Sequence, residues 1–119
     1  MYSDIDEART QHAAIKQIVE RYAGDMSGAR GDYRALRRVL ELCRRAAAAV
    51  EDRYCREKVR LVEDFAAELF SQAATRGAFL KREILNALEL FNSRLYSLET
   101  GRRKNRLQDV ALRAGAFRP

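Results

Sequence analysis

One histidine and two cysteines are the side chains in this sequence best suited to acid–base, nucleophilic or metal chemistry. His12 falls on a helical seam of apolar residues between Ile5 and Ile15, spaced by three and four positions. General acid–base catalysis needs positioned partner groups, and no such constellation surrounds His12 in the sequence. We therefore expect His12 to be a partly buried, hydrogen-bonded residue at a helix interface.

The two cysteines are also best explained as structural. Cys43 is at the centre of an apolar stripe, where it acts as a small hydrophobe. Cys55 is followed by Arg56, and a basic neighbour can lower the pKa of a thiol, so a reactive Cys55 is an alternative. Two cysteines and one histidine cannot complete a four-ligand Cys/His zinc site. The sequence therefore predicts no metal and no cofactor.

Several carboxylates in the middle of the chain suggest an acid–base or metal cluster. Basic residues alternate with them at spacings of three and four, which is typical of a solvated helix face with weak ion pairs. No phosphate-binding glycine loop, nucleophile elbow or zinc-protease motif occurs in the chain. We therefore expect a protein that is not an enzyme. The carboxylates are Glu51, Asp52, Glu57, Glu63, Asp64 and Glu68.

Basic residues are concentrated at the C-terminal end. Residues 101–119 carry six basic groups and one acidic group, while the rest of the chain is close to neutral. Clustered arginines bind phosphates and gain affinity by releasing counterions. Nucleic-acid binding through the phosphate backbone is therefore the alternative function; otherwise the cluster only solubilises a helix end. Its phosphate-binding residues would be Arg102, Arg103, Lys104 and Arg106.

Composition favours helices as the elements that position these residues. The chain has 119 residues, with proline only at its last position and six glycines. Alanine and leucine are abundant and favour helix over sheet. We predict a single all-α domain over 1–119, an elongated bundle or hairpin of three main helices with a long central helix. The predicted elements are helices over about 3–23, 32–76 and 78–100, and a basic helix or tail over 101–119.

Capping residues and glycines define these boundaries. Ser3 is the expected N-cap of the first helix, and Asp32 that of the second. Three glycines between residues 24 and 31 indicate a loop. No glycine or proline occurs between Asp32 and Arg76, so this segment is predicted to be one long helix, with two consecutive helices as the alternative.

The apolar pattern of that long helix changes in its middle. A stripe from Tyr33 to Tyr54 gives way to a second stripe from Cys55 to Ala73, rotated by about 80° at 100° per residue. Either the helix kinks near Glu51–Glu57, or its two halves pack against different partners. We favour the second interpretation because no breaker residue marks a kink. The first helix would then cover the N-terminal half and the third helix the C-terminal half.

The third helix has more apolar surface than one neighbour can cover. Beyond its main seam, Leu85 and Tyr96 lie to one side, and Phe79 and Leu90 lie nearly opposite. Large uncovered apolar surface favours association, so we expect these four residues to bind a partner and the chain to form a homodimer. The leading hypothesis is a non-catalytic helical protein-interaction module: an adaptor, a regulator or an accessory protein.

The termini and hydropathy indicate a cytoplasmic protein. No run of about 18 uncharged apolar residues is present, so we expect no transmembrane helix. The N-terminal residues are acidic and lack the apolar region of a secretory signal. The expected location is therefore the cytoplasm, without membrane attachment.

Overall fold

The computed structural model describes residues 4–22, 31–71 and 76–113, with side chains described up to Gly101 in the last range. These residues form four helices and no strand, which confirms the all-α prediction. The first three helices have 17 residues each and the last has 37. They are α1 (Ile5–Arg21), α2 (Tyr33–Ala49), α3 (Arg53–Leu69) and α4 (Gly77–Arg113).

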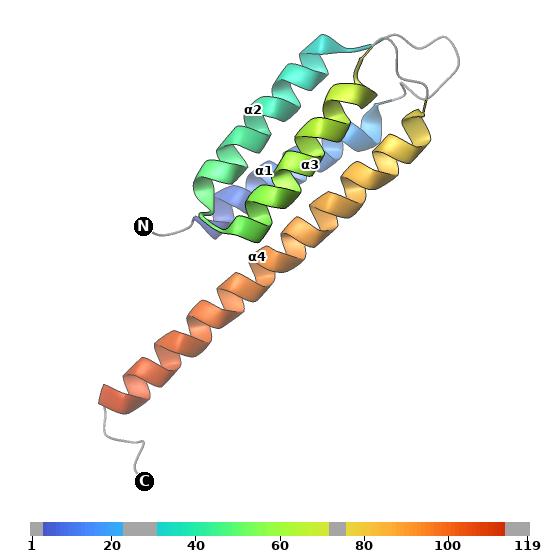
Figure 1. Cartoon of the computed structure of the whole chain (residues 1–119). Coiled ribbons are helices and arrows are strands. Elements are labelled where there is room, and N and C mark those ends of the chain that lie inside the picture. The colour runs from blue at the N-terminus through green and yellow to red at the C-terminus, as the bar shows by residue number, and fades with distance from the viewer. Residues whose placement is uncertain (1–3, 23–30, 72–75, 114–119) are drawn as a thin grey trace.

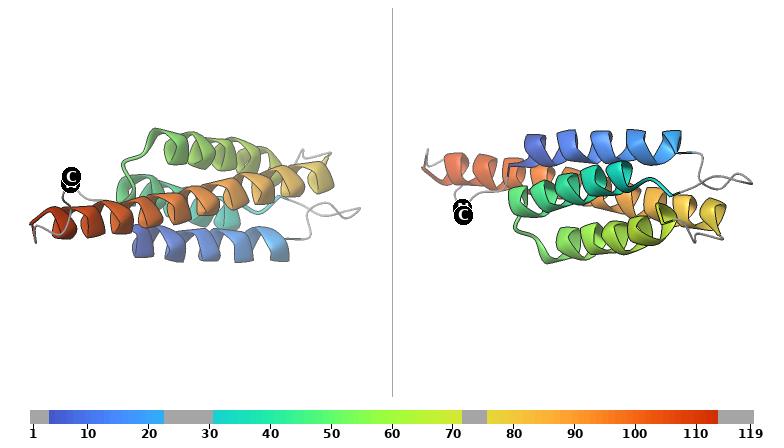
Figure 2. Two further views of the ribbon diagram at one scale, coloured as in Figure 1. Left: turned by 90° about the horizontal axis from the view of Figure 1, so that it is seen from below. Right: turned by 90° about the horizontal axis from the view of Figure 1, so that it is seen from above.

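The helices form an antiparallel bundle in which each helix runs opposite to the one before it (Figure 1). Helix α1 packs against α2 and α4, and α3 packs against the same two helices. Figure 2 shows the resulting square, with α2 nearest the viewer from above and α4 nearest from below. The predicted pairing of the first helix with residues 33–49, and of the last helix with residues 53–69, is therefore present.

An aspartate caps the N-terminus of each of the first three helices. The side chains of Asp4, Asp32 and Asp52 each accept a hydrogen bond of 3.0 Å from the backbone N–H three residues later. Each such cap stabilises a helix by about 1 kcal/mol. The prediction for Asp32 is confirmed, whereas α1 is capped by Asp4, and the predicted cap Ser3 lies outside the described residues.

The predicted continuous helix over 32–76 is wrong, because the chain turns between α2 and α3. Val50 and Asp52 both have extended backbone angles, with φ of −130° and −138°. The Asp52 N–H donates to the Val50 carbonyl over 3.0 Å. The turn needs neither glycine nor proline, because Asp52 caps the new helix and Val50 is fully buried. The change of apolar stripe thus reflects a chain reversal.

Backbone hydrogen bonds join the ends of neighbouring helices. The Asp4 N–H donates to the Ala49 carbonyl over 2.6 Å, which joins the start of α1 to the end of α2. The Asp32 N–H donates to the Phe70 carbonyl over 2.9 Å, which joins the start of α2 to the end of α3. Both bonds satisfy carbonyls that a helix C-terminus leaves without intrahelical partners.

The core fills the centre of the square with side chains from all four helices. Phe70 and Phe91 are its largest fully buried residues, and Tyr22 packs on Phe70 with 4.4 Å between ring centroids. The second predicted stripe of the middle segment is confirmed as core over α3. The buried residues of that stripe are Cys55, Val59, Val62, Ala66 and Leu69.

The first predicted stripe of the middle segment is partly wrong. Tyr33 is 62% exposed and Tyr54 38% exposed, although both were expected on the buried face. The buried face of α2 lies in the core, where α2 packs against α1 and α3, and the flank that carries Tyr33 continues to Leu40 and Ala47 beside α3. The buried residues of α2 are Val39, Leu42, Cys43 and Ala46.

Helix α4 is one continuous helix that extends past the bundle, where we predicted a boundary near residue 100 (Figure 1). Gly101 does not interrupt it, and nothing lies within 4 Å of where its Cβ would be. The buried positions of α4 reach Leu95, with Leu98 partly buried, and Arg102 and Arg106 follow on the same side of the helix. The other three helices do not extend beside this part of α4, so residues 102–113, the overhang, continue alone (Figure 1). The molecule measures 69 × 22 × 20 Å.

Among the helices described, none combines the length and the apolar character that crossing a membrane requires.

Candidate functional site

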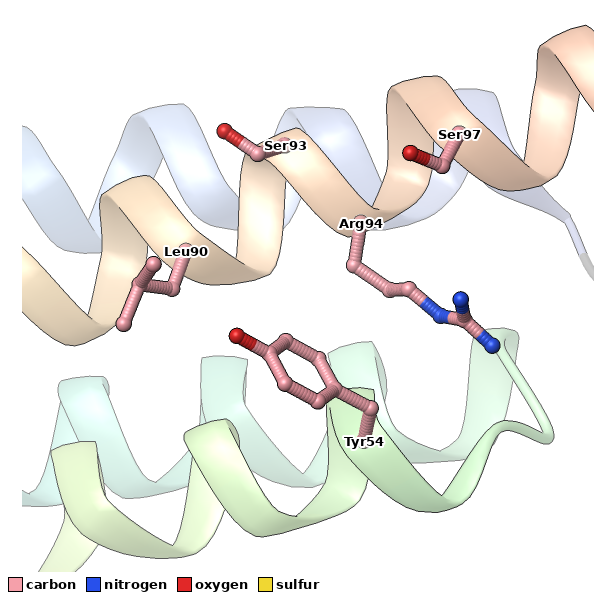
Figure 3. A pocket seen from close by; sticks show the side chains of 5 residues that line it. All are labelled: Tyr54, Leu90, Ser93, Arg94 and Ser97. Carbon is pink, nitrogen blue, oxygen red and sulfur yellow. The ribbon is translucent and has the colours of Figure 1, made fainter.

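A groove between α3 and α4 brings an apolar floor next to polar side chains (Figure 3). Leu90 and Arg94 extend from α4 toward α3, and the ring of Tyr54 stands between them. The groove has a volume of about 240 Å³, and Tyr54 and Leu90 are 38% and 37% exposed. We call it the α3–α4 groove; its lining residues are Tyr54, Leu90, Ser93, Arg94 and Ser97.

An ion pair fixes one end of this groove. The Arg94 guanidinium donates two hydrogen bonds to the Asp52 carboxylate, at 3.1 Å and 2.8 Å. This pairing, together with the capping bond from the Cys55 N–H, holds the pKa of Asp52 down at about 2. Because Asp52 also caps α3, the interaction attaches the α2–α3 turn directly to α4.

Cations flank the ring of Tyr54. The Lys58 ammonium lies 4.9 Å from the ring centroid, and the Arg94 guanidinium lies 6.0 Å from it. Both distances are within the range of cation–π attraction. The Tyr54 ring is therefore held in place while a good part of its surface remains accessible.

The apolar surface continues along both helices toward the other end of the bundle. Leu61 follows Tyr54 by seven residues on α3, and Phe79 precedes Leu90 by 11 residues on α4, so each pair lies within about 20° on its helix. Leu61 is 38% exposed and Phe79 is 37% exposed. Tyr54, Leu61, Phe79 and Leu90 together are called the apolar strip.

Cations also flank the aromatic ring at the far end of the strip. Arg76 and Arg82 lie 5.0 Å and 6.0 Å from the centroid of Phe79. Arg76 also donates to the Glu68 carboxylate at 2.7 Å and 2.8 Å. The exposed aromatic residue at each end of the strip is thus placed among positive charges.

The four predicted partner-binding residues do not form one surface. Phe79 and Leu90 lie on the α3 side of α4 and belong to the apolar strip. Leu85 and Tyr96 lie on the other flank, about 120° away around the helix. Leu85 is partly buried against the core, whereas Tyr96 is 68% exposed.

Sequence reasoning missed the contribution of α3 to this site. Tyr54 was expected on a buried face, and Leu61 was given no role, because the chain reversal at Val50–Asp52 was not anticipated. The signal that could have located them is Asp52 itself, an N-cap residue at the point where the apolar stripe shifts.

The basic features lie elsewhere. Arg102, Arg103, Lys104 and Arg106 are in the overhang, and their side chains lie outside the described part of the structure. A second group of arginines forms a ridge on the exposed side of α2, where Arg38 and Arg45 pair with Glu41 at 2.6 Å and 3.5 Å. The remaining arginines of that ridge are Arg34, Arg37 and Arg44.

The residues considered for chemistry have structural surroundings. His12 stacks on Phe91 with 6.4 Å between ring centroids, and burial lowers the pKa of its imidazole. Burial raises the pKa of both thiols, Cys43 and Cys55, to about 12. Within the described ranges, no three His, Cys, Asp or Glu side chains are grouped so that they could hold a metal ion.

No protein-family model, no curated protein and no solved structure matches this chain.

Proposed function

We propose that this chain is a non-catalytic protein-interaction module, such as an adaptor, a regulator or an accessory protein. It binds a partner by accepting an amphipathic helix along the apolar strip between α3 and α4. The observation that carries the proposal is the position of the exposed apolar residues. Of the six large hydrophobic residues exposed in the described structure, four form this strip: Tyr54, Leu61, Phe79 and Leu90.

The charges beside the strip indicate the chemistry of the partner. Arg76 and Arg94 are paired with Glu68 and Asp52, respectively. Lys58 and Arg82 have no ion-pair partner among the described residues, although each lies beside an exposed ring. A helix with apolar residues at positions i, i+3 or i+4, and i+7, flanked by carboxylates, therefore fits the strip in both shape and charge.

The test is a selection from a displayed library of helical peptides, followed by titration of the selected peptides against variants. Leu90→Glu places a carboxylate in the middle of the apolar surface and is expected to weaken binding by at least about tenfold, or about 1.4 kcal/mol. Tyr33→Glu is the matched control, because Tyr33 is a large exposed residue on α2, away from the strip. It is expected to leave binding unchanged.

Two results would refute this assignment. The first is a selection that yields no binder, or only binders that tolerate Leu90→Glu. The second is loss of helicity in Leu90→Glu, since Leu90 would then be a core residue. Leu61→Glu repeats the test on α3, where Leu61 is 38% exposed, so the strip is tested from both helices.

Nucleic-acid binding is the second candidate function, and the overhang favours it. The overhang carries Arg102, Arg103, Lys104 and Arg106 on a helix that has left the bundle. Phosphate contacts from these residues would make binding fall steeply with salt, by roughly one log unit of affinity per contact for each log unit of salt. Replacing all four by serine should then abolish binding to duplex DNA or single-stranded RNA.

A further inference from the structure

The second flank of α4 carries Tyr96, which the bundle leaves exposed, and Leu85, which the bundle covers only in part. Tyr96 is 68% exposed on this flank, next to the Arg9–Glu99 ion pair of 2.6 Å that joins α1 to α4. Leu85 precedes Tyr96 by 11 residues, and Leu107 follows it by 11. Because 11 residues complete three turns to within about 20°, the three positions lie along one side of the continuous helix.

The overhang continues this flank rather than the buried one. On the side that faces the core within the bundle, the overhang carries Arg102, Arg106 and Asp109. Leu107 and Val110 are instead at positions about 100° to 160° from the direction of Phe91, as Tyr96 is. The apolar positions of the overhang are thus aligned with a surface on the outside of α4.

We propose that a second copy of this chain binds to this flank, with the two α4 helices antiparallel and Tyr96 at the two-fold axis. The inference rests on the proposed function, since it gives the interaction module a self-association surface distinct from the apolar strip. We call this surface the outer α4 stripe. Its residues are Leu85, Glu89, Asn92, Tyr96, Thr100, Arg103, Leu107 and Val110.

Self-complementarity of the sequence supports this register. With Tyr96 opposite Tyr96, Leu85 lies opposite Leu107 of the second copy and Glu89 lies opposite Arg103. Two-fold symmetry gives each of these pairs twice. Asn92 and Thr100 form a further pair, of two polar residues. Leu85 therefore meets Leu107, and the acidic Glu89 meets the basic Arg103, along about 33 Å of helix. Val110, at the end of the stripe, lies opposite Arg82 and adds no apolar pair.

The shape of the molecule supports the same register. The bundle occupies α4 from Gly77 to about Leu98, and the overhang continues to Arg113 (Figure 1). A two-fold axis at Tyr96 is close to the point where the bundle ends. Each bundle would therefore lie beside the overhang of the other copy, and the two bundles would meet only near the axis.

The test is the oligomeric state of charge-reversed variants, measured by sedimentation equilibrium. Glu89→Arg places two basic residues opposite each other twice per dimer, and Arg103→Glu does the same with two acidic residues. Each variant alone is expected to dimerise at least about tenfold more weakly than the wild type. An equimolar mixture of the two variants is expected to form a heterodimer of near wild-type affinity, because every pair in it is again of opposite charge.

Recovery in the mixture also shows that both variants are folded. The double variant Glu89→Arg/Arg103→Glu should likewise dimerise as the wild type does. A wild type that remains monomeric at about 100 μM would overturn the inference, because its dimer Kd would then be weaker than about 100 μM. So would a dimer that neither charge reversal weakens, or a mixture that shows no recovery.

Failure of this inference can be distinguished from failure of the proposed function. The peptide titrations with Leu90→Glu probe the opposite flank of α4 and do not depend on self-association. A dimer that Leu90→Glu disrupts, and that the charge reversals leave intact, would place the second copy on the apolar strip and would overturn the proposal for the outer α4 stripe.

Discussion

The ion pair between Asp52 and Arg94, which fixes one end of the α3–α4 groove, should contribute measurably to the free energy of unfolding. In Asp52→Asn the amide still caps α3, but the charge that pairs with Arg94 is lost. The pKa of Asp52 falls from its ordinary value of 3.8 to about 2, which corresponds to somewhat over 2 kcal/mol. The Arg94 side chain is 40% exposed, so solvent screening weakens the ion pair. We therefore expect Asp52→Asn to lower the free energy of unfolding by about 1–2 kcal/mol.

The assay is urea denaturation followed by far-UV circular dichroism, with Arg94→Met as the second arm of a double-mutant cycle. Methionine keeps an apolar stem of similar length beside Tyr54 without the charge. Each single variant should lower the free energy of unfolding by about 1–2 kcal/mol, and the double variant should lower it by little more than either single variant does. Losses that simply add would show that the two side chains do not interact, and would refute this reasoning.

The same ion pair predicts a specific dependence on pH. The folded-state pKa of Asp52 lies below its unfolded value, so its stabilising effect is complete above about pH 4 and is lost as the pH falls toward 2. Between pH 4 and pH 2 the free energy of unfolding of the wild type should therefore fall by about 1–2 kcal/mol more than that of Asp52→Asn. Parallel curves for the two proteins over this range would contradict the assignment.

Two further predictions concern other parts of the molecule. Cys43 and Cys55, whose pKa values are about 12, should react with a thiol reagent at pH 8 only after unfolding, since about one thiol in 10,000 is ionised there; rapid labelling of the native protein would show that one of them is accessible. Gly101→Ala should raise the helicity of α4, because alanine favours helix over glycine and nothing lies within 4 Å of the added Cβ. Amide exchange around residue 101 should then slow by a factor equivalent to about 1 kcal/mol. Unchanged exchange would show that this glycine does not weaken the helix.

Local signals in the sequence predicted much of the fold. The Asp32 cap marked the real start of α2, and α1 ends before the glycine-rich segment over 24–31, most of which lies outside the described residues. The pairing of helices also followed from apolar patterns, since each amphipathic stripe needs one neighbour to cover it. These features depend on short stretches of chain, where the periodicity of the residues is sufficient.

The errors arose where tertiary structure decided between locally similar choices. The turn at Val50–Asp52 has no glycine or proline, and only the shift of the apolar stripe indicated it. The boundary predicted near residue 100 is also wrong, because α4 continues through Gly101, and one glycine costs a helix only about 1 kcal/mol. The continuity of α4 is what places Leu107 in line with Tyr96.

The candidate site was only half predictable for the same reason. Phe79 and Leu90 could be recognised because they lie off the main seam of one helix. Tyr54 and Leu61 belong to the same surface only because α3 packs antiparallel beside α4. A surface shared by two helices cannot be seen in the periodicity of either one.

The most direct test of the interaction-module proposal compares a selected helical peptide with nucleic acid in one fluorescence-anisotropy experiment. Binding of the peptide, of random-sequence duplex DNA and of single-stranded RNA would be measured from about 50 mM to 500 mM salt. Docking on the apolar strip should weaken binding of the peptide by no more than about tenfold across this range, because burial of apolar surface responds little to salt and only the pairs with Lys58 and Arg82 are screened. Micromolar binding of DNA or RNA that collapses with salt, with no peptide binding at any salt concentration, would contradict the proposal.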